Sequence, residues 1–161
     1  MPAPFRRIVT GHDPQGRAIV MLDEQLTPAP TPSGDAEFAL VWTSACLPAD
    51  NNDDTDGRTR PAGLTLHGGS VLRVVDMVPG GTSPMHRTNS LDYGVVLSGT
   101  VELELDDGAV TLLQPGDIVV QRGTIHAWRN PSREEAARIL FVLTEATPRR
   151  VDGQPLPEIQ P

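Results

Sequence analysis

The sequence predicts an all-β fold, a single barrel or sandwich, on three observations. The 161 residues include 16 prolines and 15 glycines, which break a chain into short segments and disfavour long helices. Apolar segments recur between turn signals at a spacing of roughly 8 to 12 residues, as in β-sandwiches and barrels. Residues 101–105, Val-Glu-Leu-Glu-Leu, alternate strictly, so one face of this strand is buried and the other faces water. A chain of this length most often forms one domain with a real core.

Residues 1–65 are expected to lie outside the barrel. Residues 5–9 and 18–22 are short apolar runs that flank a loop rich in glycine and proline, which predicts a β-hairpin or β-arm. A Pro-rich connector follows at residues 27–36, and residues 38–43 predict a strand.

An acidic segment, residues 48–63, completes this N-terminal part. It carries Asp50, Asp53, Asp54 and Asp56 and almost no apolar side chain. It lacks the ordered carboxylates and closing glutamate of an EF-hand, so we expect a solvated, mobile loop rather than a calcium loop.

Residues 66–146 are expected to form the barrel and residues 147–161 a Pro-rich tail. Asp107-Gly108 is a strong hairpin signal, and Ser132 to Glu135 match a capping box before a run too β-rich to sustain more than one helical turn. The tail is expected to be loose or draped over a partner. The predicted strands cover residues 71–78, 91–97, 101–105, 109–113, 117–121, 125–128 and 138–144.

Composition excludes several kinds of protein. The net charge of −8 and the few aromatic residues argue against a nucleic-acid partner. All 13 basic residues are arginine, so a lysine base or Schiff base is excluded, and the lone Cys46 excludes an intrachain disulfide. No apolar run approaches the roughly 20 residues of a membrane span, and the first residues do not read as a signal peptide. We therefore expect a cytoplasmic protein without a membrane partner.

Two histidines follow Gly- and Pro-rich turns within residues 78–130. Five residues separate Gly80 from His86, and Thr88, Asp92 and Gly99 follow. A second segment runs from Pro115-Gly116-Asp117 to His126 and Asn130. This spacing resembles the two sequence motifs of the cupin superfamily, in the right order, and most closely its small single-domain members. The resemblance covers about residues 71–144 and implies a double-stranded β-helix, a small jelly-roll barrel whose motif histidines point inward.

The resemblance also implies a metal site of three histidines and a glutamate, which this chain supplies only in part. His86 and His126 stand at the first and third histidine positions, Thr88 replaces the second histidine, and Asp92 replaces the glutamate. The second motif is one residue short, with Gln121-Arg122-Gly123 in place of the usual proline-containing turn.

His86, Asp92 and His126 would together form a two-histidine, one-carboxylate set. Such a set suits iron, and also zinc, manganese or nickel; no organic cofactor is expected. Aspartate is shorter than glutamate and threonine is a poor ligand, so a metal-free pocket lined by His86 and His126 remains open. In either case these two histidines are the best acid or base candidates, because only histidine titrates near neutrality unperturbed. His12 and His67 lie outside both motifs and are expected to be ordinary loop residues.

Further residues are predicted to bind substrate. Strand alternation places Trp128 on the same face as His126, where it forms either a wall for a planar ligand or part of the core. Arg87 and Arg122 lie near the pocket mouth by motif position and either clamp a carboxylate or are surface charges. Thr88 lies two residues after His86 in the sequence and is also predicted to bind substrate. Tyr93 should point to the opposite face from Asp92.

Two functions from different classes follow. The first is a divalent-metal-dependent lyase, isomerase or oxygenase that acts on a small organic metabolite in the barrel. The second is a non-catalytic small-ligand-binding protein with a degenerate, metal-free site. A homodimer is predicted, because the N-terminal arm could cover an edge strand of its own or a second subunit and because cupins are commonly dimers.

Overall fold

The computed structural model describes residues 3–161, and the prediction of an all-β fold is confirmed. The helical residues described are two short 3-10 turns, η1 (Gly57–Thr59) and η2 (Asp106–Gly108). No helix within residues 3–161 has the length and apolar character needed to cross a bilayer. The strands are β1 (Phe5–His12), β2 (Ala18–Leu26), β3 (Ala29–Pro30), β4 (Ala36–Ser44), β5 (Ser70–Met77), β6 (Ser90–Ser98), β7 (Val101–Glu104), β8 (Val110–Leu113), β9 (Ile118–Arg122), β10 (Ala127–Arg129), β11 (Ala137–Glu145), β12 (Arg150–Val151) and β13 (Gln154–Pro155).

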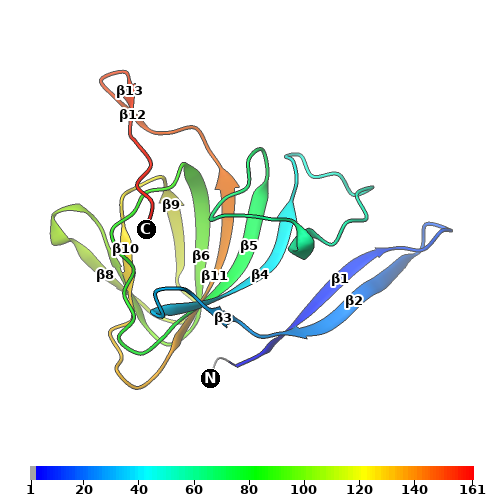
Figure 1. The fold of residues 1–161 in the computed structure, drawn as a ribbon, viewed down its shortest axis with the longest axis horizontal. Coiled ribbons are helices and arrows are strands. Elements are labelled where there is room, and N and C mark those ends of the chain that lie inside the picture. Colours follow the sequence, from blue (N-terminus) through cyan, green and yellow to red (C-terminus); the bar gives the residue numbers. More distant parts are fainter. Residues whose placement is uncertain (1–2) are drawn as a thin grey trace.

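Two antiparallel sheets form the barrel (Figure 1). The larger sheet has the strand order β3-β4-β5-β11-β6-β9, and the smaller has the order β10-β7-β8. The core lies between them, with Val75 and Ile139 from the larger sheet and Val101, Leu103 and Trp128 from the smaller one. This arrangement is the double-stranded β-helix that the motif spacing predicts.

The predicted N-terminal arm is a β-hairpin that projects from the barrel (Figure 1). β1 pairs with β2 from Phe5–Leu26 to His12–Ala18, and within residues 3–161 no strand ladder joins this hairpin to a barrel sheet. Arg7 fixes its base, because the buried guanidinium donates to the carbonyl of Val41 on β4 (2.9 Å) and to both carboxylate oxygens of Asp56 (2.9 and 2.7 Å).

The acidic segment is more ordered than the expectation of a wholly solvated loop. Asp56 accepts from the backbone N–H of Arg58 at the start of η1 and binds Arg7 of the hairpin. Arg60 binds Asp53 and the carbonyl of Thr43. The expectation of a solvated loop therefore fails at Asp56 and Arg60, because Arg7 and the carbonyl of Thr43 lie outside the segment and cannot be read from its composition.

The expectation for the tail needs correction, whereas the expectation of at most one helical turn after Ser132 is confirmed. The tail packs on its own barrel: after the β12–β13 hairpin, Ile159 and Arg87 exchange two backbone hydrogen bonds of 2.9 Å. At Ser132 the hydroxyl accepts from the N–H groups of Glu134 and Glu135, as in a capping box, but no helix follows because β11 begins at Ala137.

Candidate functional site

The backbone joins the two motif histidines directly. His86 and His126 lie just outside named strands, and the N–H of each donates to the carbonyl of the other over 2.9 Å. This pairing brings the imidazole ring centroids to 4.1 Å from one another. The two motifs, 40 positions apart in the sequence, thus meet at a single point of the barrel.

Both imidazoles have a defined proton position. Nδ1 of His86 lies 2.9 Å from the carbonyl oxygen of Pro84, and Nδ1 of His126 lies 3.0 Å from that of Thr124. A carbonyl oxygen only accepts, so each Nδ1 carries a proton, and in the neutral form of each ring Nε2 holds the lone pair.

Gln121 separates His126 from the acidic member of the motif. Its amide nitrogen donates to Oδ2 of Asp92 over 2.9 Å and to Nε2 of His126 over 3.2 Å. The lone pair of His126 is therefore engaged, whereas no described side chain donates to Nε2 of His86. Of the two histidines, His86 is the one with a free basic nitrogen.

Burial sets the charge states of this cluster. It lowers the pKa of His126 from 6.5 to about 4, against the opposing hydrogen bond to Thr124, and the nearby His86 lowers it further. Burial also raises the pKa of Asp92, although hydrogen bonds from Ser90 and Gln121 and the charges of His86 and Arg73 act in the opposite direction. His126 is thus a neutral imidazole at neutral pH, and Asp92 holds a proton more readily than an exposed aspartate.

The metal set predicted from the motifs is not assembled. Across residues 3–161, no group of three or more His, Cys, Asp or Glu side chains is arranged to hold a metal ion. His86 and His126 come together, but the Gln121 amide occupies Oδ2 of Asp92 and Nε2 of His126. As arranged, the donors do not fit the three-ligand centre.

The histidines open into a barrel cavity of about 440 Å³. This is within the usual range for small-molecule sites, roughly 300–1,000 Å³. Trp128 lines it as predicted, with its ring edge-on to Phe141 at a centroid distance of 5.4 Å. Thr88 also lines it, and its hydroxyl is 2.8 Å from that of Ser90.

The two arginines predicted to clamp a substrate do not line this cavity. Arg122 is exposed at the end of β9, and its neighbour Gln121 takes the inward position, as the two-residue period of a strand requires. Arg87 donates to the carbonyl of Pro157 in the tail. Of the two alternatives, the clamp is therefore not supported for either arginine, because motif position does not specify which face of the backbone a side chain occupies, and Arg122 is the surface charge. Tyr93 is exposed, on the face opposite to Asp92, as predicted.

Two cavity residues were missed by the sequence reasoning, Gln121 and Arg73. Arg73 is only 8% exposed and lies on β5 at the inward positions shared with Val71, Val75 and Met77. The available signal was a single charge at an inward position of a strand that is otherwise mostly apolar. For Gln121, the shortened second motif offered no comparable signal.

The tail lies at the mouth of the cavity. Besides the Arg87–Ile159 pair, the Glu158 carboxylate accepts from the N–H of Asn89 over 2.9 Å. Pro161 lines the cavity itself. Pro161 at the end of this tail thus contributes to the wall of the pocket.

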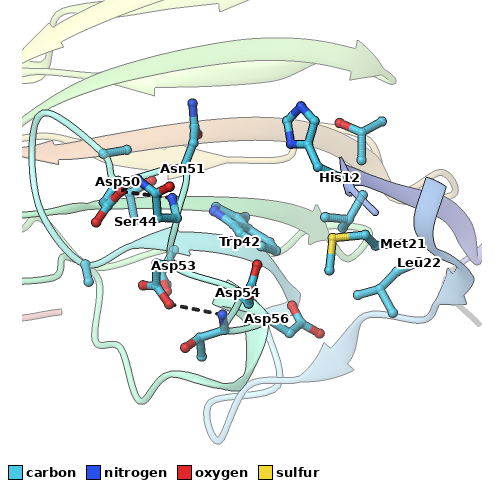
Figure 2. Close-up of a pocket in the computed structure, with 18 of the residues that line it drawn as sticks. His12, Met21, Leu22, Trp42, Ser44, Asp50, Asn51, Asp53, Asp54 and Asp56 are labelled. Carbon is cyan, nitrogen blue, oxygen red and sulfur yellow. Dashed lines mark hydrogen bonds between the residues drawn. The ribbon is translucent and has the colours of Figure 1, made fainter. Parts of the chain in front are cut away.

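A second, larger hollow of about 790 Å³ lies between the N-terminal hairpin and the acidic segment. Figure 2 shows Trp42 between the hairpin residues Met21 and Leu22 and the acidic residue Asp53. Asp53 and Asp56 are already paired with arginines, and His12 is the single histidine of the lining. The barrel cavity, with its clustered histidines, is therefore the candidate functional site.

Comparisons with known proteins agree with this geometry. The family model for the cupin domain matches residues 73–143. Phomopsin biosynthesis cluster protein C' of Diaporthe leptostromiformis is 43% identical over 155 residues, which cover 92% of this chain and 82% of that protein. A cupin-domain-containing oxidoreductase of Neurospora crassa, srdB, is 36% identical over 157 residues, covering 95% of this chain and 79% of the relative.

Solved structures support the fold. A putative ethanolamine utilization protein of Salmonella typhimurium superposes with a TM-score of 0.51 at 11% identity, over 88% of this chain and 96% of that one. A cupin-2 domain protein of Rhodospirillum rubrum gives a TM-score of 0.50 at 17% identity, over 83% of this chain and 72% of the other.

Proposed function

We propose, from the premise that this chain belongs to the cupin family, that it is an enzyme that performs acid–base chemistry on a small organic metabolite in its barrel cavity. The observation that carries the proposal is the free Nε2 of His86, which lies in one cavity with Asp92, a carboxyl group whose pKa burial raises. A basic nitrogen and a carboxyl group that takes up a proton more readily than an exposed aspartate are the two partners that a proton transfer needs.

Each residue has a distinct role in this proposal. His86 takes a proton at Nε2 from a substrate carbon next to a carbonyl group, and Asp92 in its protonated form donates a proton to the substrate at a second atom. The substrate is thereby isomerised with no change in its electron count, and solvent restores the two side chains. His126 stays neutral, and Gln121 holds it and Asp92 in place.

The relatives support a place in small-molecule synthesis. Phomopsin biosynthesis cluster protein C' and the oryzines biosynthesis cluster protein J of Aspergillus oryzae carry that setting in their names. By likeness to them, we propose that the metabolite is an intermediate in the synthesis of a small organic product.

Deuterium exchange tests the proposal without knowledge of the natural substrate. The protein is incubated in D₂O with planar ketones such as 1-tetralone and 2-tetralone, and loss of the α-proton signal is followed by NMR. We expect exchange faster than in buffer with the same concentration of imidazole, and a loss of about 100-fold or more in His86→Gln.

His67→Gln is the matched control, because His67 is exposed and bound to Glu145 outside the cavity. It should exchange the ketones as the unchanged protein does. Exchange no faster than buffer for either ketone, or equal rates in His86→Gln and His67→Gln, would refute the acid–base role.

A metal-dependent oxidoreductase is the second candidate, supported by the names of the relatives in Neurospora crassa and Aspergillus ruber. His86 and His126 would hold the ion, once Gln121 releases Nε2 of His126. Iron, manganese or nickel would supply redox chemistry, and zinc would polarise a carbonyl group.

Metal content decides between the two candidates. Elemental analysis of untagged protein, as purified and after incubation with each ion, should show less than about one-tenth of an equivalent if the acid–base proposal is right. About one equivalent that disappears in His86→Gln would establish the metal-dependent alternative.

A further inference from the structure

The barrel cavity is also lined by the buried guanidinium of Arg73, which has no role in the function proposed above. Arg73 is 8% exposed, and its Nη2 donates to the backbone carbonyls of Gly63 and Leu64. Its guanidinium carbon lies 5.5 Å from the centre of the Phe38 ring. Arginine stays charged in proteins, so the cavity wall carries a fixed positive charge.

This charge is not neutralised by an ion pair. Within residues 3–161 its hydrogen bonds go to carbonyl oxygens, and Nε has no hydrogen-bond partner although it is buried. The Asp92 carboxyl group in the same cavity acts on this charge without a direct hydrogen bond or ion pair. A buried cation that lacks a directly paired carboxylate is costly, and a planar guanidinium matches a carboxylate with two parallel hydrogen bonds. The guanidinium that lines the cavity thus keeps a donor, Nε, without an acceptor among the described residues.

Two acceptors lie in the same cavity. Oδ1 of Asp92 and Oε1 of Gln121 are buried without a hydrogen-bond partner, and the two side chains are only 3% and 6% exposed. A ligand hydroxyl or N–H group could donate to either. The remaining wall is mainly apolar, and it includes the aromatic side chains of Phe38, Trp128 and Phe141 among aliphatic ones.

We propose that Arg73 binds the carboxylate of the substrate, and that the substrate class is a planar, mainly apolar carboxylic acid that also carries a hydroxyl or N–H donor. This inference rests on the proposed function, since it names the substrate class for the same cavity. Arg73 anchors the carboxylate, the aromatic side chains cover the planar body, and Oε1 of Gln121 accepts from the donor group.

Calorimetric titration with three probes tests the inference. The probes are 6-hydroxy-2-naphthoate, its uncharged amide 6-hydroxy-2-naphthamide, and 2-naphthoate, which lacks the hydroxyl. We expect the hydroxynaphthoate to bind the unchanged protein at least 10-fold more tightly than the amide does, and more tightly than 2-naphthoate.

Variants then assign the preference to Arg73. Arg73→Gln should weaken binding of the hydroxynaphthoate by about 10- to 100-fold while leaving the amide within about 3-fold, since a hydrogen bond to a charged group is lost. Arg73→Lys keeps the charge without the planar fork and should recover part of the affinity. Arg122→Gln is the matched control, because that arginine is exposed outside the cavity, and it should bind as the unchanged protein does.

The comparison of the three probes on the unchanged protein stands even if Arg73→Gln fails to fold. Equal affinity for carboxylate and amide, no binding of any probe up to millimolar concentration, or equal losses for both in a folded Arg73→Gln would overturn the inference. A carboxylate preference in a protein that exchanges no ketone protons would instead refute the acid–base function and leave the binding role of Arg73 intact.

Discussion

His126 couples the stability of the barrel to pH at the scale of a single residue. Its pKa is about 4 in the fold and near 6.5 in an unfolded chain, because burial disfavours the charged imidazole. Between these two values the unfolded state binds the proton and the folded state does not. Stability from this group is therefore complete above about pH 6.5 and is lost as the pH falls towards 4.

The expected loss is about 3 kcal/mol, at about 1.36 kcal/mol for each pKa unit between 6.5 and about 4. Urea unfolding at several pH values between 4.5 and 7 measures it. His126→Gln removes the titrating group, so its stability should change less over this range than that of the unchanged protein. Parallel pH profiles for the two proteins would show that His126 does not carry the effect.

Asp92 has the opposite effect to His126 on the pH dependence of stability: it is destabilising at neutral pH, and this effect decreases at lower pH. Burial raises its pKa, so its charge at neutral pH destabilises the fold, and Oδ1 has no hydrogen-bond partner. We expect Asp92→Asn to raise the free energy of unfolding at pH 7 by about 1 kcal/mol or more, because a buried charge is removed while the oxygen that accepts from Gln121 is kept. The gain should shrink as the pH is lowered and Asp92 in the unchanged protein takes up its proton. Chemical unfolding at pH 7 and 4.5 measures both effects, with the exposed Asp54→Asn as control, and a less stable Asp92→Asn at pH 7 would contradict the account.

The sequence predicts the residues whose place the motif fixes and misses those whose place depends on distant contacts. His86, His126 and Trp128 all reach the cavity, because motif spacing and strand alternation determine them locally. Gln121 acquires its role only by lying between Asp92 and His126. The inward position of Arg73 follows from strand periodicity. That its Nε has no hydrogen-bond partner can be seen only in the packed structure.

At the scale of elements, turns were predictable and long-range packing was not. Asp107 and Gly108 have φ values of 59° and 71°, as the hairpin signal requires. The motif residue Gly99 has a φ of 71°, and a Cβ there would lie 2.8 Å from Cα of Ala137, so glycine is needed between β6 and β7. The return of the tail to Arg87 depends on a pairing 72 positions apart in the sequence, for which composition gives no signal.

The packing of the tail against the barrel leads to a further prediction. Deletion of residues 156–161 removes two backbone hydrogen bonds to Arg87 and one from Asn89 to Glu158. We expect faster amide hydrogen exchange at Arg87 and Asn89 and faster dissociation of a cavity ligand, because one wall of the mouth is lost. Global stability should fall by only about 1 kcal/mol, since these bonds are exposed. Amide exchange measured by NMR, with the amides of β11 as internal control, checks this; unchanged protection at Arg87 would show that the tail does not pair there in solution.

The whole molecule presents two apolar surfaces that a second copy could cover. The hairpin exposes apolar side chains on both strands, including Ile8 and Val20, the latter 58% exposed. β9 ends the larger sheet and exposes Ile118 (68%) and Val120 on its outer side. Edge strands with exposed apolar residues favour pairing with another chain. Arg7 holds the base of the hairpin to β4 and Asp56, so the arm is fixed in a projecting position.

These features support a homodimer in which the hairpin of one copy packs along β9 of the other. Light scattering at micromolar concentration should then give twice the mass of one chain. Val20→Asp on the hairpin and Ile118→Asp on β9 should each shift the mass towards that of a monomer, because each places a charge in the buried contact. Leu47→Asp is the control, since Leu47 is also an exposed apolar residue (51%) but lies outside both surfaces. A mixture of Val20→Asp and Ile118→Asp retains one intact hairpin and one intact β9, so heterodimers should form through that pair alone. A monomer mass for the unchanged protein, or dimers that persist in both aspartate variants, would show that these two surfaces do not meet.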